Sequence, residues 1–377
     1  MRMDSPALLG YLVRVDSKPM SDPIKLSLAM IVKNEARCLA RCLDSIRSVV
    51  DEIVIADTGS TDDTVAIARR QGARVVSFPW NNDFAAARNF ALEQTTGAWI
   101  LALDADEQAS GALAQEVRRF IAGPPQIGRL KIVSDFRHQG QTLRSSTFVS
   151  RLFPRGARFE GRIHEQIASP LPRVNLRGEL WHDGYLEAHK SQRNVTLLQA
   201  ELAREPGSAY LQFQLALEFT SLGRPRDAFA CLQQARARMQ PTDPFAPNVI
   251  VDFLYAAMEL KQYEAGLEAM RAAGNWLADF PDFHHVCGLF YMRYIGSNPA
   301  KHIADMPRIE QSFRRCLALG ETEKYKSVAG TGSFLANYNL AVFHHALGDD
   351  ARARPCLEAA ARQNYAPAIA LLKQLKS

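Results

Sequence analysis

The sequence predicts a Rossmann-like α/β domain with a mostly parallel sheet, followed by an all-α domain of helical repeats. Over residues 25–190, short apolar runs alternate with amphipathic segments, which is the pattern of βαβ units. Over residues 191–377, strand-like runs are replaced by paired helical segments with a period of about 34 residues. Residues 1–24 contain three prolines and little patterning, so we expect an N-terminal tail there.

The α/β half is predicted element by element from these runs. We expect strands at residues 26–32, 52–56, 74–78 and 99–103, because each of these runs is short and apolar. Apolar residues recur at helical spacing between them, so we expect helices at residues 35–48, 62–71 and 83–96. Asp83 is expected to cap the third helix, and Gly97 is expected to end it.

The helical half repeats one residue template. In a 34-residue helical hairpin, small residues lie where the two helices cross, and larger apolar residues flank them. Three copies fit this template: Leu215, Ala216, Phe219, Ala228, Leu232 and Ala235; Phe253, Leu254, Ala257, Gly266, Met270 and Ala273; and Leu340, Ala341, His344, Ala353, Leu357 and Ala360. A fourth copy around Gly288 requires an insertion, expected at residues 298–306. Gly223 and Gly348 are expected at inter-helix turns, and residues 367–375 are expected to form a capping helix.

Composition and charge narrow the class of protein. Of 377 residues, 47% are hydrophobic and 23% are charged, which excludes a disordered chain. The net charge of +5 is small for this length and does not indicate a nucleic-acid-binding protein. No apolar run approaches the ~18 residues of a transmembrane segment, and the N-terminus lacks the apolar core of a secretory signal. Six cysteines without a CxxC pair indicate reduced thiols in a cytoplasmic protein, free or at the inner face of the membrane.

Acidic residues follow three of the predicted strands. Glu35 comes soon after the first strand, Asp57 directly after the second, and Asp104 and Asp106 after the fourth. Ligands of an open parallel sheet bind beyond the carboxyl ends of its strands, so these acids meet where a ligand would bind. Two carboxylates at positions i and i+2 of an extended chain face the same side and can share one Mg²⁺ or Mn²⁺. Acids at strand ends also cap the next helix, and the residues alone leave both interpretations open.

Four segments together resemble the family 2 glycosyltransferases of GT-A fold. They are residues 27–35 (SLAMIVKNE), 51–62 (DEIVIADTGSTD), 84–89 (FAAARN) and 103–106 (LDAD). Their order and spacing match that family over residues 25–110. Three later segments are more loosely similar to bacterial proteins that join a short GT-A domain to tetratricopeptide (TPR) repeats, including peptide S-glycosyltransferases. These are residues 151–153 (RLF), 161–165 (GRIHE) and 182–185 (HDGY).

The resemblance implies inverting transfer of a hexose-type sugar from a nucleotide-sugar donor, and it assigns roles to particular residues. Ile31, Lys33 and Glu35 would border the nucleoside, Asp57 would contact its base, and Arg88 and Asp104 would help hold the donor. Asp104 and Asp106 would bind Mn²⁺ or Mg²⁺ on the diphosphate, and His182 would be a third ligand. Asp57 can accept a hydrogen bond from N3–H of uracil, which favours a UDP-sugar. The alternatives are a turn-forming Asp57, a solvated Arg88 and a core histidine at position 182.

An inverting displacement also needs a base that deprotonates the acceptor as it attacks the anomeric carbon. Glu165 is our first candidate because the resemblance places an acceptor-side acid there, and Asp135 and His164 are its rivals. The structural alternative for Glu165 is a salt bridge, since residues 129–162 carry eight Lys and Arg against two acids. That basic stretch is either a solvated strand face or a surface that attracts an acidic ligand.

Three functions from different classes follow from these observations. We expect a metal-dependent glycosyltransferase whose TPR-like domain engages a protein or peptide acceptor; a lipopolysaccharide or capsule glycan is the alternative acceptor. A binding scaffold without activity is the second hypothesis, and the acids at Asp57, Asp104 and Asp106 argue against it. A nucleotidyltransferase would need a glycine-rich phosphate loop after the first strand, and residues 33–35 contain no glycine.

Overall fold

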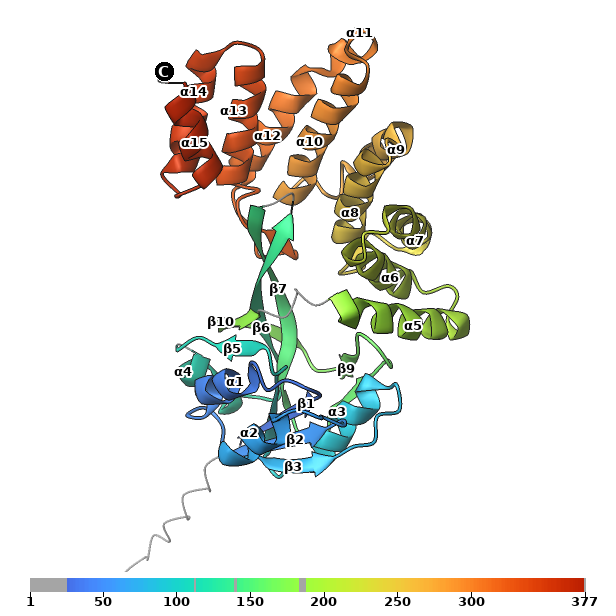
Figure 1. Ribbon diagram of the computed structural model, residues 1–377, viewed down its shortest axis with the longest axis vertical. Coiled ribbons are helices and arrows are strands. Elements are labelled where there is room, and N and C mark those ends of the chain that lie inside the picture. The colour runs from blue at the N-terminus through green and yellow to red at the C-terminus, as the bar shows by residue number, and fades with distance from the viewer. Residues whose placement is uncertain (1–25, 112, 139–140, 183–187, 376–377) are drawn as a thin grey trace, which may run out of the picture.

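The computed structural model describes residues 26–111, 113–138, 141–182 and 188–375 of the chain (Figure 1). The predicted tail, residues 1–24, lies outside these ranges. Within them, a β-sheet with helices on both faces is followed by an array of paired helices, as the sequence predicts. Figure 1 shows this array arching over one end of the sheet.

The first half of the sheet is parallel. Strands β1 (Leu26–Val32), β2 (Glu52–Asp57), β3 (Arg74–Ser77) and β4 (Trp99–Ala102) lie in the order β3-β2-β1-β4. The connecting helices are α1 (Leu39–Ile46), α2 (Thr64–Arg70) and α3 (Phe84–Glu93). Asp83 caps α3 as predicted, because its carboxylate accepts a hydrogen bond of 2.8 Å from the Ala86 N–H.

The second half of the sheet is dominated by a long hairpin, which the sequence prediction does not contain. Strands β6 (Ile127–His138) and β7 (Gln141–Pro154) form this hairpin, and β7 pairs antiparallel with β4. Strands β10 (Arg173–His182) and β5 (Glu107–Ala109) complete the order β7-β6-β10-β5, with α4 (Leu113–Ile121) between β5 and β6 in the chain. Strands β8 (Arg158–Glu160) and β9 (Gln166–Ala168) form a separate ribbon. The sheet is therefore mixed, because strands joined by a hairpin must pair antiparallel.

Two apolar layers cover the two faces of the sheet. Because side chains alternate along β1, Met30 packs with α1 and α4, whereas Ala29 packs with α3. The face toward α3 is lined by Ala29, Ala56 and Ala102, each at most 3% exposed. These small side chains let α3 lie close to the sheet, which brings Arg88 within reach of the carboxyl end of β4.

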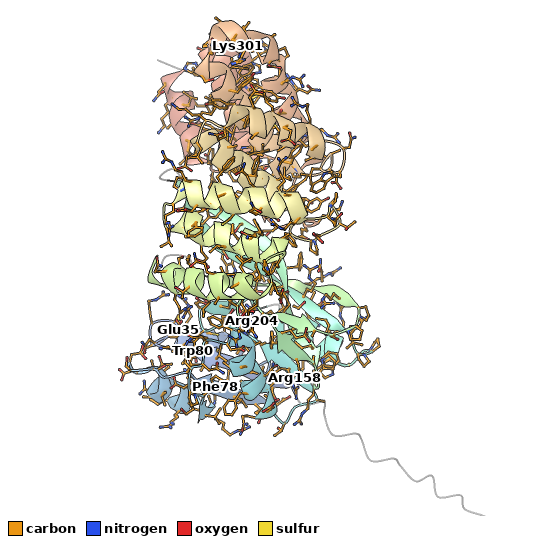
Figure 2. The ribbon with its side chains drawn as sticks, turned by 90° about the vertical axis from the view of Figure 1, so that its right-hand side faces the viewer. Glu35, Phe78, Trp80, Arg158, Arg204 and Lys301 are labelled. Carbon is orange, nitrogen blue, oxygen red and sulfur yellow. The ribbon has the colours of Figure 1, made fainter. Side chains whose placement is uncertain are left out.

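The helical array begins with α5 (Ala188–Arg204) and continues as helix pairs. The pairs are α6 (Ala209–Ser221) with α7 (Pro225–Arg238), α8 (Ala246–Glu259) with α9 (Tyr263–Ala273), α10 (Pro281–Ser297) with α12 (Pro307–Leu319), and α13 (Phe334–Ala346) with α14 (Asp350–Ala361). Helix α11 (Pro299–His302) and a 3-10 turn (Ile303–Asp305) lie where the sequence predicts an insertion. Helix α15 (Ala366–Gln374) packs on α14. In Figure 2 the helices stack away from the α/β domain, with Lys301 of α11 at the far end.

The repeat template lies where the paired helices cross. All residues of its three predicted copies are buried. Gly223 and Gly348 have φ angles of +66° and +75° at the predicted turns, a backbone conformation that glycine adopts without strain. At Gly266 of α9, a Cβ atom would lie 2.2 Å from Cε2 of Phe290 in α10. The missing side chain at this position is what allows the phenylalanine ring to pack there.

The α/β domain and the helical array contact each other at two places. Ile163, from the segment between β8 and β9, packs in an apolar cluster with residues of α5 and α6. Farther along the array, strand β11 (Ser327–Val328), between α12 and α13, pairs antiparallel with β7. The Asp282 carboxylate of α10 holds β11, accepting hydrogen bonds from Ser327 Oγ at 2.6 Å and the Val328 N–H at 2.8 Å. The array is therefore attached to the domain through the segment between β8 and β9 and through β7.

Candidate active site

Hydrogen bonds join the loops that follow β1 and β2. The Asn34 N–H donates to Ser60 Oγ at 3.0 Å, and the Thr61 N–H donates to Asn34 Oδ1 at 2.7 Å. Asp57, 9% exposed at the end of β2, accepts hydrogen bonds of 3.2 Å from the N–H groups of Gly59 and Ser60. The turn that the sequence left open for Asp57 is thus present. These bonds fix the two loops beside each other.

The residues predicted to border a nucleoside lie at the same edge. Ile31 is half-buried near the end of β1, and Lys33 is exposed directly after it. Glu35 is half-buried, and its backbone N–H donates to Thr64 Oγ1 at 2.7 Å. The carboxyl edge of the parallel strands, where an open α/β sheet binds ligands, therefore carries all three of these residues and Asp57.

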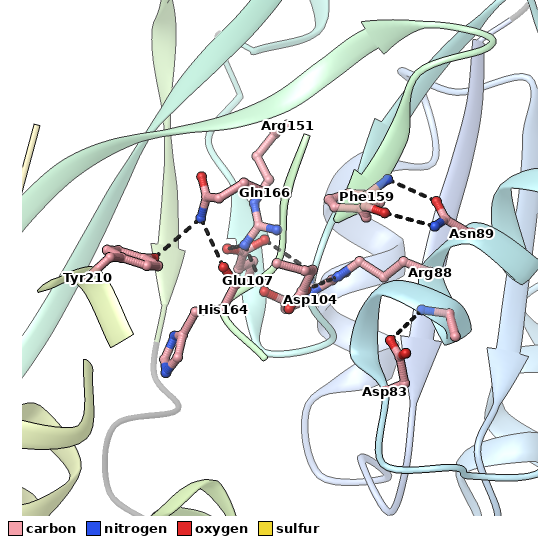
Figure 3. Close-up of polar contacts among 12 residues, drawn as sticks. Asp83, Arg88, Asn89, Asp104, Glu107, Arg151, Phe159, His164, Gln166 and Tyr210 are labelled. Carbon is pink, nitrogen blue, oxygen red and sulfur yellow. Dashed lines mark hydrogen bonds and ion pairs between the residues drawn. The ribbon is translucent and has the colours of Figure 1, made fainter. Parts of the chain in front are cut away.

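Asp104 lies in a cluster of charges beyond the end of β4 (Figure 3). Its Oδ1 accepts a hydrogen bond of 2.7 Å from Arg88 Nη2, and its Oδ2 accepts one of 2.7 Å from Arg151 Nη2. Arg88 also donates to Glu165, and Arg151 also donates to Glu107. Both arginine side chains are 10% exposed, whereas that of Asp104 is 34% exposed. Two buried guanidinium groups thus join three carboxylates.

The cluster stabilises the ionised forms of its central groups. Burial alone would raise the pKa of Asp104, but Arg151 and Arg88 hold that pKa well below its usual range. Burial alone would lower the pKa values of both arginines, but the neighbouring carboxylates raise them. Burial raises the pKa of Glu107, which the charge of Arg151 only partly offsets. Asp104 is therefore a carboxylate whose negative charge is strongly held.

Helix α3 also positions the segment that carries Glu165. Asn89 Nδ2 donates to the Phe159 carbonyl, and the Phe159 N–H donates to Asn89 Oδ1, both at 2.9 Å. The Phe84 N–H, at the start of α3, donates to the Arg162 carbonyl at 2.8 Å. Residues 161–166 are thereby held against α3.

Glu165 and Asp104 both form an ion pair with Arg88. Arg88 Nε donates to Glu165 Oε1 while its Nη2 donates to Asp104. The Glu165 side chain is 10% exposed. The salt bridge that the sequence left open is therefore present, and the residue also lies next to the acid pair at the end of β4. One side chain connects the predicted donor and acceptor sides of the site.

His164 lies between this cluster and the first helices of the array. Its φ angle is +53°, and its Nε2 is buried without a hydrogen-bond partner in the described part of the chain. Burial lowers its pKa, so its ring is neutral near pH 7. Gln166 Nε2 donates to the His164 carbonyl at 3.2 Å and to the Tyr210 hydroxyl of α6 at 3.4 Å (Figure 3). Tyr210 of the helical array thus contacts Gln166, the residue that follows Glu165.

Asp106 and His182, both predicted as metal ligands, lie together. Because β5 pairs with β10, His182 is opposite Glu107, and its Nε2 is 3.5 Å from Asp106 Oδ2. Burial would lower the pKa of His182, but Asp106 raises it. Carboxylate oxygens suit Mn²⁺ and Mg²⁺, and a neutral imidazole is a common metal ligand. Asp104, the other predicted ligand, has both oxygens paired with arginines, and no group of three His, Cys, Asp or Glu within the described ranges is arranged to hold a metal ion.

Asp135, a predicted alternative base, lies apart from the cluster. Its carboxylate on β6 accepts from Arg144 Nε at 2.8 Å and Nη2 at 3.2 Å, and its side chain is 47% exposed. Ser134, the preceding residue, has its Oγ 3.4 Å from His182 Nδ1. Successive side chains on a strand face opposite sides, so Asp135 points away from His182.

Arg151 and Glu107 belong to the cluster, although neither was predicted from the sequence as a site residue. A buried carboxylate needs a positively charged partner. Residues 104–107 contain three acids and no Lys or Arg, so the partner has to come from another part of the chain. Arg151 supplies it because β7 pairs with β4 through Leu152 and Leu101. That pairing joins strands far apart in the sequence, and only the folded sheet reveals it.

Comparisons with known proteins agree with this architecture. Residues 27–180 match the family model described as glycosyl transferase family 2. A TPR repeat-containing protein of Synechococcus elongatus is 32% identical over 263 residues, which cover 65% of this chain and 64% of that protein. The SPbeta prophage-derived glycosyltransferase SunS of Bacillus subtilis is 27% identical over 230 residues, or 57% of this chain and 54% of SunS. An uncharacterized glycosyltransferase of Rickettsia felis is 41% identical over 102 residues, or 27% of this chain and 36% of that protein.

The matches cover less than two thirds of each of these relatives, from 36% to 64% of their length. As for the membrane, none of the helices in the described ranges combines the length and apolar character that crossing a bilayer requires.

Proposed function

We propose that this protein transfers a hexose-type sugar from a UDP-sugar to an acceptor, with inversion at the anomeric carbon, because residues 27–180 match the family model described as glycosyl transferase family 2. One observation carries the proposal. Arg88 contacts both Asp104, at the proposed diphosphate end of the site, and Glu165, the proposed base. Transfer needs donor and acceptor groups held a few ångströms apart, and this shared contact supports that arrangement.

The donor nucleotide would lie across the carboxyl ends of β1, β2 and β4. Ile31, Lys33 and Glu35 would border the nucleoside. Asp57 would accept the N3–H of uracil in addition to its backbone hydrogen bonds, since an ionised carboxylate has about four acceptor sites. Arg88 would hold the diphosphate.

Asp106 and His182 would hold Mn²⁺ or Mg²⁺, with Asp104 as a further ligand. The carboxylate suits either cation, and the imidazole, 3.5 Å away, favours Mn²⁺ over Mg²⁺, which prefers oxygen ligands. When bound, the cation would stabilise the negative charge that develops on the leaving diphosphate.

Glu165 is the proposed base. Its Oε1 accepts from Arg88, and an ionised carboxylate retains further lone pairs for the acceptor proton. His164 is the rival, because its ring is neutral and its buried Nε2 has no partner among the described residues. Asp135 is the third candidate, and its ion pair with Arg144 on the other face of the sheet argues against it.

We propose a protein or peptide acceptor, because repeat arrays present extended surfaces that bind polypeptides and Tyr210 of this array contacts Gln166, the residue next to the proposed base. A glycan of a lipopolysaccharide or capsule is the alternative. We place the activity in the cytoplasm or at the inner face of the membrane, since all six cysteines are free thiols.

A panel of UDP-sugars with Mn²⁺, assayed for UDP release and followed by mass spectrometry of candidate acceptors, tests this function. Glu165→Gln keeps an acceptor for Arg88, so it should preserve UDP affinity while lowering turnover by about 10² to 10⁴, the usual contribution of a general base. Glu160→Gln, at an exposed position of β8, is the matched control. Unchanged turnover in Glu165→Gln would move the base to His164. Absence of UDP release from every donor would refute the function and favour a binding scaffold.

A further inference from the structure

Each carboxylate oxygen of Asp104 already contacts an arginine in this structure, so a metal ion at Asp104 would lie beside two positive charges. Its two oxygens accept hydrogen bonds of 2.7 Å from Arg88 Nη2 and Arg151 Nη2. The whole residues Arg88 and Arg151 are 9% and 8% exposed, so water competes poorly for these contacts. The side chain of Asp104 is nevertheless 34% exposed and accessible to a ligand.

Both arginines retain hydrogen-bonding capacity that the described residues do not use. Arg88 Nη1 and Arg151 Nε are buried and have no partner in the described part of the chain. Buried donors normally find a partner, and a planar guanidinium is well matched to phosphate oxygens. Both guanidinium groups that contact Asp104 therefore keep one donor that a phosphate oxygen could satisfy.

From this arrangement we propose that the donor diphosphate takes over Arg88 and Arg151 from Asp104, and that the released carboxylate then completes the cation site with Asp106 and His182. This inference rests on the proposed function. It assigns Arg151 to donor binding. It also implies that the protein binds the metal ion only weakly until a nucleotide is present.

The charges of the cluster support this order. Arg88 and Arg151 carry two positive charges, and Asp104, Glu107 and Glu165 carry three negative ones. A dication at Asp104 alone would lie beside two guanidinium groups and would have to displace them without compensation. A diphosphate supplies about two negative charges to both the arginines and the cation. Cation and nucleotide should therefore strengthen each other's binding by the same factor.

Removing one of the two competing arginines tests the proposal. Arg151→Gln with Glu107→Gln removes one charge of each sign, so the cluster keeps its net charge and Asp104 Oδ2 becomes available. Mn²⁺ binding, followed by electron paramagnetic resonance without nucleotide, should tighten by about tenfold, within the usual range of such couplings. The factor by which UDP enhances Mn²⁺ binding should shrink. Arg144→Gln, which breaks an exposed ion pair on the same strand, should change neither quantity.

A second variant frees the other oxygen of Asp104 independently. Arg88→Gln with Glu165→Gln should tighten Mn²⁺ binding without nucleotide in the same way, and it serves if the first variant does not fold. The inference is overturned if folded variants bind Mn²⁺ alone no more tightly than the wild type does. If UDP and Mn²⁺ bind together but neither variant alters the coupling, only this inference fails. If UDP does not bind under any condition, the proposed function fails as well.

Discussion

Replacing Arg88 by Met removes the cation that contacts both Asp104 and Glu165. The methionine fills a similar volume, so the main effect is electrostatic. Two carboxylates would each lose an ion pair with Arg88. Asp104 would lose its 2.7 Å contact to Arg88 Nη2. Glu165, whose side chain is 10% exposed, would lose its contact to Arg88 Nε. Arg151 still contacts Asp104, whereas Glu165 has no other ion pair within the described residues. The cost therefore falls mainly on Glu165.

The expected magnitude follows from this burial. Removing one partner of a buried ion pair destabilises a protein by about 3–5 kcal/mol, because the remaining charge is left without compensation. At a denaturant slope of about 2 kcal/mol per molar urea, the unfolding midpoint of the α/β domain should fall by roughly 1.5–2.5 M. An exposed ion pair contributes about 0–1 kcal/mol. Arg162→Met is a matched control, because that side chain is 47% exposed and 3.7 Å from its acidic partners.

Urea unfolding monitored by tryptophan fluorescence can measure this, since three of the four tryptophans, Trp80, Trp99 and Trp181, lie in the α/β half of the chain. Adding Glu165→Gln to Arg88→Met should recover part of the loss, because it removes the unpaired charge. The electrostatic account is refuted if Arg88→Met lowers the midpoint no more than Arg162→Met does, or if the second substitution recovers nothing.

Two further predictions concern the helical array. Gly266→Ala should destabilise the array by about 1–3 kcal/mol, because the new Cβ would lie 2.2 Å from the Phe290 ring. Gly296→Ala, with no atom within 4 Å of the new Cβ, should be neutral or stabilising, so equal melting temperatures for the two variants would contradict the packing argument. Burial raises the pKa of Asp252 from 3.8 to about 6, so its neutral form favours folding below about pH 4 and this contribution is lost as the pH rises through 6. Asp252→Asn should therefore be more stable than the wild type at pH 7.5, by up to about 3 kcal/mol for a shift of about two pKa units, and similar to it at about pH 3.5; thermal melts at both values check this, and a difference independent of pH would contradict it.

Local patterns were sufficient to predict much of this fold. The parallel strands were predictable from their apolar runs, and Asp83 from the geometry of helix caps. Gly223 and Gly348 were predictable because an inter-helix turn requires positive φ. The proximity of His182 to Asp106 was expected only from the family resemblance, and the structure shows the two side chains 3.5 Å apart.

The remaining features depend on contacts between distant parts of the chain. The pairing of β7 with β4 brings Arg151 to Asp104 and Glu107, and no local pattern specifies that pairing. The same holds for β11, whose pairing with β7 links the helical array to the sheet. The ion pairs of Asp104 with the two arginines were also not predictable, because an aspartate after a strand has the same local sequence whether its partner is a metal ion or an arginine.

The most direct test of the proposed donor site is a calorimetric titration of UDP into the 377-residue chain in the presence of Mn²⁺. The account predicts saturable binding of one UDP per chain, weakened at least about tenfold by Asp106→Ala, since a lost charged contact costs about 1.5–3 kcal/mol. If the wild-type chain takes up no UDP, or if Asp106→Ala binds it as tightly as the wild type does, the carboxyl edge of this sheet is not a metal-assisted nucleotide-sugar site.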